Sequence, residues 1–174
     1  MNVTLNVHGP LDRETVSDYR LWVTVSDMGN PSRTTNVSFT IEILDDNDHC
    51  PQLHIETTFM MVNRDITTEY FIVHLIATDK DEGPNGQVTF GLPSSSPFIT
   101  LYPNGTLIVQ TNSTLIVDDS IVTLPVQIRD HGQPTSCLVV ETLRLYVGSN
   151  RTDWSAVLHA NKKQDDDDEA ISVR

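Results

Sequence analysis

The sequence predicts an all-β protein built as an antiparallel β-sandwich. Apolar and polar residues alternate with a period of two along 17–26 and 34–44, as expected for strands with one buried face. No long segment shows the periodicity of a helix. Turn-forming Asp, Gly, Asn and Pro residues separate the alternating segments, for example at 27–31. Short strands joined by such turns are typical of packed antiparallel sheets.

The same pattern recurs along most of the chain. The segments expected to form strands are 2–7, 17–26, 34–44, 53–62, 70–78, 87–92, 105–110, 121–129 and 138–147. After Val147 the alternation stops, and an unbroken acidic run follows at 165–169. Because a block of like charges repels itself and stays solvated, we expect residues 149–174 to form a disordered acidic tail.

An internal repeat indicates the domain organisation. The turn at 27–31 has a counterpart at 130–134, and each follows an alternating segment. The same shift superimposes apolar strand residues, namely Leu21, Val23 and Val25 on Leu124, Val126 and Ile128. The next strand requires a slip of one residue. A period of roughly one hundred residues is the length of one sandwich domain. We therefore expect part of one repeat at 1–45 and a complete repeat at 46–148, followed by the tail.

The charge of the chain excludes several classes of partner. The formal net charge is −13, from 24 acidic and 11 basic side chains. Nucleic acids and acidic lipid surfaces would be repelled by this charge, whereas cations would be attracted. No run approaches the roughly 18 apolar residues of a membrane span, and no signal peptide is visible. We expect no nucleic acid and no small-molecule substrate as partners.

Glycosylation sequons nevertheless indicate an extracellular protein. Candidate Asn-X-Ser/Thr acceptors occur at Asn2, Asn36, Asn104, Asn112 and Asn150. The alternative is chance in a chain rich in these residues. Together with the missing leader, the sequons suggest a fragment or truncated product of a protein whose leader and membrane anchor lie elsewhere.

Acidic clusters at the ends of expected strands are candidates for a cation site. The densest is Asp45, Asp46, Asn47 and Asp48. Calcium binds oxygen ligands, and adjacent carboxylates without a counterion repel one another. A polar turn is the alternative, since Asp and Asn favour turns. Further acidic pairs alternate, so that both members would face one side of an extended segment; they are Asp12 with Glu14, and Asp79 with Asp81.

The motifs as a whole resemble those of the cadherin repeat family, in particular protocadherin- and Fat-like extracellular repeats. The matching segments, in the family's order, are Leu11 to Glu14, Tyr19 to Pro31, Asp45 to Pro51, Asp79 to Val88 and Val126 to Pro134. The resemblance covers roughly residues 1–147. It implies Greek-key β-sandwich repeats, one partial and one complete, with Ca²⁺ held in the linker between them.

The resemblance also implies the calcium ligands. Carried over position by position, they are Asp12, Glu14, Asp45, Asp46, Asn47, Asp48, His49, Asp79, Asp81, Asn85 and Asp130. Asp46, His49 and Asn85 would contribute their carbonyl oxygens. His49 departs from the family, which usually has Asn there; a ligand that acts through its carbonyl tolerates the change.

The function implied is calcium-dependent cell adhesion of the homophilic type. Calcium in the linker would stiffen successive repeats on the extracellular side of the plasma membrane. The partners would be other cadherin repeats, of the same or a related protein on an adjacent cell. The alternative is a secreted, calcium-stabilised β-sandwich binding module without an adhesive role.

An enzyme is not expected. Paired carboxylates can act in hydrolysis, but the sequence contains no nucleophile elbow, no HExxH motif and no Gly-rich phosphate loop. The histidines are scattered without the spacing of a zinc site.

The two cysteines are candidates for a disulfide. Cys50 follows Asp48, and Cys137 opens the strand that follows Asp130. If both aspartates approach the same ions, as the resemblance implies, both thiols lie at one end of the second sandwich. The alternative is two separate thiols. We also expect the incomplete first repeat to have an open apolar face.

Overall fold

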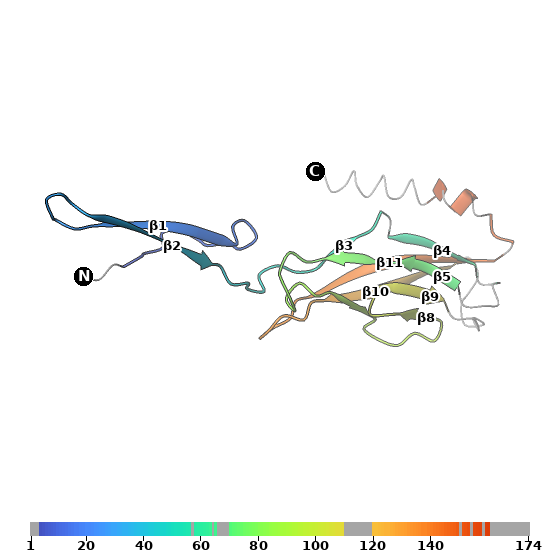
Figure 1. Cartoon of the computed structure of the whole chain (residues 1–174). Coiled ribbons are helices and arrows are strands. Elements are labelled where there is room, and N and C mark those ends of the chain that lie inside the picture. Colours follow the sequence, from blue (N-terminus) through green and yellow to red (C-terminus); the bar gives the residue numbers. More distant parts are fainter. Residues whose placement is uncertain are drawn as a thin grey trace.

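Almost all of the regular secondary structure among the described residues is β-strand, which confirms the predicted all-β class (Figure 1). The computed structural model describes residues 4–56, 58–63, 65, 70–109, 120–149, 151–153, 155–157 and 159–160. The strands are β1 (Asp18–Ser26), β2 (Thr34–Glu42), β3 (Gln52–His54), β4 (Phe59–Asn63), β5 (Tyr70–His74), β6 (Ile76–Thr78), β7 (Thr89–Gly91), β8 (Ile99–Leu101), β9 (Thr106–Val109), β10 (Ser120–Arg129) and β11 (Leu138–Gly148).

The tail segment is only partly described. A short helical stretch at 155–157 and 159–160 was not expected from the sequence. The acidic run at 165–169 lies outside the described residues. Within the described part of the chain, no helix has the length and apolar character needed to cross a membrane.

The N-terminal part of the chain, residues 4–45 (the hairpin half), forms a long hairpin. Strands β1 and β2 pair in an antiparallel two-stranded sheet that extends away from the rest of the fold (Figure 1). Alternation places Tyr19, Leu21, Phe39 and Ile41 on one face, because Tyr19 pairs with Ile41 and Leu21 with Phe39. This face is only partly covered, and Phe39 remains 40% exposed. The open apolar face expected for the first half is therefore present.

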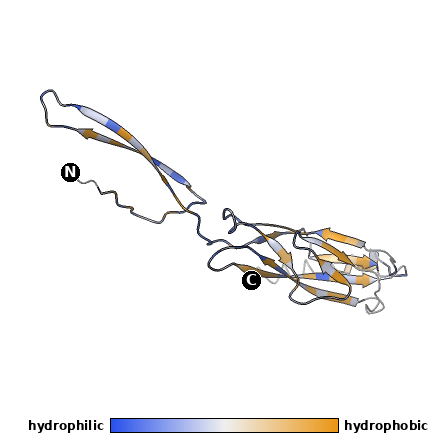
Figure 2. Cartoon of the chain, turned by 60° about the horizontal axis from the view of Figure 1, so that its bottom comes forward, coloured by the Kyte–Doolittle hydropathy of each residue, from blue (hydrophilic) through white to orange (hydrophobic). Residues whose placement is uncertain are grey.

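Strands β3 to β11 (the sandwich half) form a two-layered sandwich. One layer has the strand order β4-β11-β10-β7, and the other contains β5-β9-β8 together with β3-β6. Hydrophobic residues are concentrated on these strands, whereas the linker to the hairpin is hydrophilic (Figure 2). The core between the layers contains Val62, Leu75, Ile99, Leu107, Val109, Leu124, Val126, Ile128, Leu143 and Leu145.

The segment expected as one strand at 53–62 forms two strands instead. Strand β3 pairs with β6, whereas β4 pairs in parallel with β11 in the opposite layer. The chain therefore changes layers between His54 and Phe59. A strand that changes layers closes the edge of a sandwich. The point at which such a strand breaks depends on the strands with which its two parts pair, and the local alternation of residues does not reveal those partners.

The expected strand at 70–78 is also divided. Strands β5 and β6 are interrupted at Leu75, whose N–H donates to the Gly105 carbonyl at 2.8 Å. Gly105 has φ +89°, and a Cβ there would overlap the Leu75 carbonyl. A glycine is therefore required at this close approach. Strand β8 was not expected, because it is only three residues long and follows a Pro- and Ser-rich segment.

The prediction of a strand at 2–7 is wrong for its described residues, 4–7, which have no strand pairing. Leu5 and Val7 instead line a shallow hollow with Leu21 and Ile41 on the apolar face of the hairpin. Covering part of this face buries apolar area, which an edge position beside the hairpin would not do.

The one-residue slip between the two halves is confirmed. Leu21 pairs with Phe39 in the hairpin, and its counterpart Leu124 pairs with Leu143 in the sandwich. Leu143 is 0% exposed because a second layer faces it. Equivalent positions thus differ in burial only because the hairpin lacks a facing sheet among the described residues.

Cys50 and Cys137 form a disulfide, with their Cα atoms 5.5 Å apart and 87 residues apart in sequence. Cys50 follows the linker, and Cys137 immediately precedes β11. The bond therefore connects the start of the sandwich to one of its central strands.

Leu143→Ala is expected to lower the free energy of unfolding by about 2–5 kcal/mol, because it removes a fully buried side chain. The matched variant Phe39→Ala alters the equivalent hairpin position and should change the main transition by less than about 1 kcal/mol. Urea unfolding followed by circular dichroism measures both. Equal losses would mean that the hairpin and the sandwich share one core.

Replacing both cysteines, Cys50→Ser with Cys137→Ser, is expected to lower the free energy of unfolding by about 4.6 kcal/mol, the loop-entropy value for a closed loop of this length. Calorimetry of the oxidised, reduced and doubly substituted chains measures it. The reduced chain should match the double variant, and a loss below about 1 kcal/mol in both would contradict the expectation.

Candidate metal centre

Acidic residues from separate segments meet where the hairpin joins the sandwich. They come from the loop before β1, from the linker after β2, from the loop after β6 and from the turn after β10. The fold thus brings together residues that are far apart in sequence, in the region that the motifs indicated.

Four side chains form a compact ligand group. One potential ligand atom each from Glu14, Asp48, His49 and Asp81 lies within 4.8 Å of the others. Among the described residues this is the only such group of three or more His, Cys, Asp or Glu side chains. The Asp81 side chain is 0% exposed, whereas that of Asp48 is 64% exposed. The group therefore has a buried floor and an open side.

The loop after β6 holds the buried carboxylate of Asp81 in place. The Asp81 N–H donates to Asp79 Oδ1 at 3.1 Å, and the His49 N–H donates to Asp81 Oδ2 at 3.2 Å. Gly86 allows the loop to fold back, since a Cβ there would overlap the Asp81 carbonyl. Burial raises the pKa of Asp81, and the carboxylates of Asp79 and Asp45 act in the same direction. The negative charge of the Asp81 carboxylate is therefore poorly compensated by its surroundings.

The imidazole of His49 lies between two of these carboxylates. Its Nδ1 is 2.9 Å from Asp48 Oδ1 and 3.2 Å from Asp81 Oδ1. Although partial burial opposes protonation, the neighbouring carboxylates raise the pKa of His49. Residue 49 thus presents a side-chain nitrogen to the group as well as its backbone.

Arg13 is the main counter-charge of the centre. Its side chain is only 9% exposed and forms ion pairs with Glu14, with Asp45 at 2.5 Å and with Glu82 at 2.7 Å. It also donates to the Lys80 carbonyl at 3.0 Å, so it links the hairpin half to the sandwich. Arg13 was not among the predicted site residues, although its position between Asp12 and Glu14 was a usable signal.

Asp45 is held by donors from the sandwich. Asn85 Nδ2 donates to Asp45 Oδ2 at 2.8 Å, and the Glu82 N–H donates to Oδ1 at 3.1 Å. Burial opposes the effect, but these donors and Arg13 lower the pKa of Asp45. The carboxylate is therefore ionised and oriented toward the loop after β6.

Asp130 and Asn47 form the rear of the centre. Asp130 is 0% exposed and accepts hydrogen bonds from the N–H groups of Gly132 and Cys137, each at 2.9 Å. Asn47 Nδ2 donates to Asp130 Oδ2 at 3.3 Å and to the Thr135 carbonyl at 2.9 Å. Gly132 makes room for this contact, since a Cβ there would overlap the Asn47 amide.

Two buried oxygens of the centre have no donor within the described structure. They are Asn47 Oδ1 and Asp79 Oδ2. Buried acceptors are nearly always satisfied in folded proteins. A hard cation that takes several oxygen ligands would satisfy them and offset the surplus negative charge, so the residues present fit Ca²⁺.

The acidic pair of the first half is not arranged as expected. Residues 13–15 form a turn, and Thr15 donates to both carboxylate oxygens of Asp12, at 3.2 and 2.7 Å. The prediction that Asp12 and Glu14 lie in an extended segment is therefore wrong. Only Glu14 enters the four-residue group. Asp46 is exposed, and within the described part of the chain its side chain accepts the Asn47 N–H at 3.1 Å.

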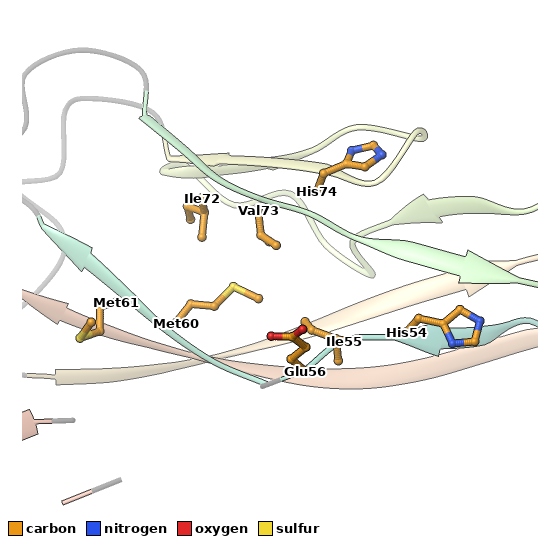
Figure 3. A pocket seen from close by; sticks show the side chains of 8 residues that line it. All are labelled: His54, Ile55, Glu56, Met60, Met61, Ile72, Val73 and His74. Atoms are coloured by element: carbon orange, nitrogen blue, oxygen red, sulfur yellow. The ribbon is translucent and has the colours of Figure 1, made fainter. Parts of the chain in front are cut away.

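A second hollow lies between β4 and β5, and the polar side chains among its described lining residues do not point toward one another. Met60 extends into it, whereas His54 and His74 lie on separate strands and do not point toward each other (Figure 3). His54 Nε2 contacts the Thr78 hydroxyl at 2.6 Å. The hollow contains an apolar side chain, and its described lining residues form no group of metal ligands.

Two of the sequons lie on exposed parts of the structure. Asn36 is in the middle of β2, and Asn104 is in the turn between β8 and β9, where its Oδ1 accepts the Thr106 N–H at 3.1 Å. Asn2, Asn112 and Asn150 lie outside the described residues.

Comparisons with known proteins agree with one family. The model of the cadherin domain matches residues 1–44. Human protocadherin gamma-A5 is 33% identical over 132 residues, which are 71% of this chain and 14% of that protein. Human protocadherin Fat 1 is 39% identical over 88 residues, which are 51% of this chain and 2% of that protein. The chain thus spans a small part of the length of these relatives.

Solved structures agree as well. The extracellular domain of protocadherin gamma-B4 matches 80% of this chain and 23% of its own, with a TM-score of 0.68 and 29% identity. Extracellular cadherin domains 3–6 of protocadherin gamma-B2 match 79% of this chain and 34% of theirs, with a TM-score of 0.67 and 27% identity. These relatives are cadherins and not enzymes. Given the motifs, the sandwich and these matches, the chain belongs to the cadherin repeat family.

Proposed function

We propose that this chain is part of the extracellular region of a calcium-dependent adhesion protein, in which Ca²⁺ at the junction stiffens the joint between hairpin and sandwich. The observation that carries the proposal is the convergence of the carboxylates of Glu14, Asp48 and Asp81, beside buried acceptors that have no donor within the described residues.

The proposed ligands come from both sides of the joint. From the hairpin side they are Asp12 and Glu14; from the linker Asp45, Asp46, Asn47, Asp48 and His49; from the sandwich Asp79, Asp81, Asn85 and Asp130. Bound there, Ca²⁺ would supply positive charge for oxygens that the fold holds together. Asp12 would have to release Thr15 to take part, and Asp45 would exchange part of its contact with Arg13.

The effect on the joint follows from charge. Without a cation, carboxylates from both halves repel one another, and the hairpin is tethered mainly by the linker and by Arg13. With Ca²⁺, the same carboxylates become mutual ligands. The joint between hairpin and sandwich should then change from flexible to stiff. Extracellular modules typically bind Ca²⁺ at about 10⁻⁴–10⁻³ M, so extracellular calcium would fill the site.

The wider assignment extends this proposal. Residues 1–45 would be the end of one repeat, 46–148 a complete repeat and 149–174 a tail. The whole protein would act in homophilic adhesion at the extracellular side of the plasma membrane, with cadherin repeats on an adjacent cell as partners. The disulfide supports an oxidising compartment. Asn36 and Asn104 would be accessible for glycosylation.

Asp81→Asn is expected to act in opposite directions with and without calcium. In chelator it should raise Tm, because it removes a buried carboxylate that lies among other carboxylates. In millimolar calcium it should lower Tm relative to the unaltered chain, because a ligand is lost. Thermal melts under both conditions test this, with the exposed Asp18→Asn as control. If calcium does not change the Tm of the unaltered chain, the proposed function is wrong.

Glu14→Gln tests whether the cation bridges the two halves. A bridging ion should bind about tenfold more weakly when this hairpin-side charge is removed. The control Asp27→Asn alters an acidic residue of the same half whose contacts are confined to its own turn. Calcium titration by calorimetry measures both. Unchanged affinity for Glu14→Gln would favour the alternative, a secreted sandwich module with a purely local calcium site.

A further inference from the structure

We propose that the junction also binds a borderline divalent metal ion such as Zn²⁺, through the imidazole of His49. The site shares Glu14, Asp48 and Asp81 with the proposed calcium centre but does not require calcium to bind. It depends on a nitrogen ligand, which separates it from an all-oxygen calcium site.

The composition and number of the ligand atoms support the proposal. His49 Nδ1 lies 2.9 Å from Asp48 Oδ1 and 3.2 Å from Asp81 Oδ1, and a Glu14 carboxylate oxygen lies within 4.8 Å of this group. One imidazole nitrogen and three carboxylate oxygens make four donors, the usual number for Zn²⁺. Calcium gains little from an imidazole because it prefers oxygen.

The surroundings of Asp81 provide a second observation. Its side chain is 0% exposed, and His49 is the only basic side chain paired with it among the described residues. Asp79, which accepts the Asp81 N–H, has a buried Oδ2 without a donor there. A buried carboxylate with so little compensation favours a bound cation.

The geometry is within reach of zinc coordination. Zinc bonds of about 2.0–2.2 Å place tetrahedral ligand atoms about 3.4 Å apart. The contacts of His49 Nδ1 with Asp48 and Asp81, at 2.9 and 3.2 Å, must open by about 0.2–0.5 Å, and the widest separation in the group, at most 4.8 Å, must close by up to about 1.4 Å. Asp48 and His49 are 64% and 31% exposed, so they are free to adjust and leave an entry path.

Other described histidines do not offer such a site. His54, His74 and His131 each contact a threonine hydroxyl, and none belongs to a group of ligand side chains. Sequence spacing did not reveal the site, because its four ligands come from three separate segments.

The experiment titrates Zn²⁺ into the metal-free full chain by calorimetry. We expect one zinc ion per chain and at least tenfold weaker binding for His49→Asn. The same substitution should change calcium affinity less than twofold, because asparagine keeps the backbone carbonyl. His8→Asn is the matched control and should bind zinc as the unaltered chain does. Melts without metal establish that each variant is folded.

A spectroscopic measurement identifies the nitrogen ligand. Co²⁺ in place of zinc should give visible absorption bands typical of tetrahedral coordination, and these should be lost in His49→Asn and on addition of excess Zn²⁺. Zinc binding that is absent, or unchanged in His49→Asn, would overturn the proposal whatever calcium does. If zinc binds through His49 but calcium has no effect, this inference stands and the proposed function fails.

Discussion

The structure around the junction depends on the repulsion between carboxylates that the fold forces together. Asp81 is fully buried, Asp130 lies in the rear wall, and Asp45 faces the loop after β6. Each is held by backbone N–H groups, and Gly86 and Gly132 allow the close approaches. The fold therefore holds these carboxylate oxygens in place without a cation. Their mutual repulsion is a cost that folding of the sandwich offsets and that a cation would remove.

Two basic side chains moderate this repulsion from within the chain. Arg13 pairs with carboxylates of both halves, while His49 lies between Asp48 and Asp81. Neither donates a hydrogen bond to the buried oxygens Asn47 Oδ1 and Asp79 Oδ2. The centre thus has a structure of its own, yet retains capacity for an additional cation.

Much of the fold could be predicted because strands with one buried face leave a strong pattern. The long strands β10 and β11 lie where alternation placed them, with the expected slip relative to the hairpin. The breaks at Leu75 and between β3 and β4 could not be predicted, since they depend on which layer each half-strand pairs with. Strand β8 was missed because three residues are too few to show a period.

The site was predictable as a region and less so in its detail. Motif order indicated that Asp45, Asp81 and Asp130 would meet, and they lie around one junction. The assumption of an extended segment failed at Asp12, because Thr15 closes a turn on its carboxylate. The role of Arg13 was missed since a motif identifies residues one at a time, whereas an ion pair is a property of two.

The disulfide has a mechanical consequence. A pulling force applied along the chain enters the sandwich at Cys50 and passes through the covalent bond to Cys137 and β11. The loop that the bond closes, whose ends are 87 residues apart in sequence, carries no tension, so roughly 300 Å of contour length is withheld from extension. Under load the sandwich therefore yields only where β11 and the hairpin are peeled away. A domain linked in this way resists stretching even when its core is transiently open.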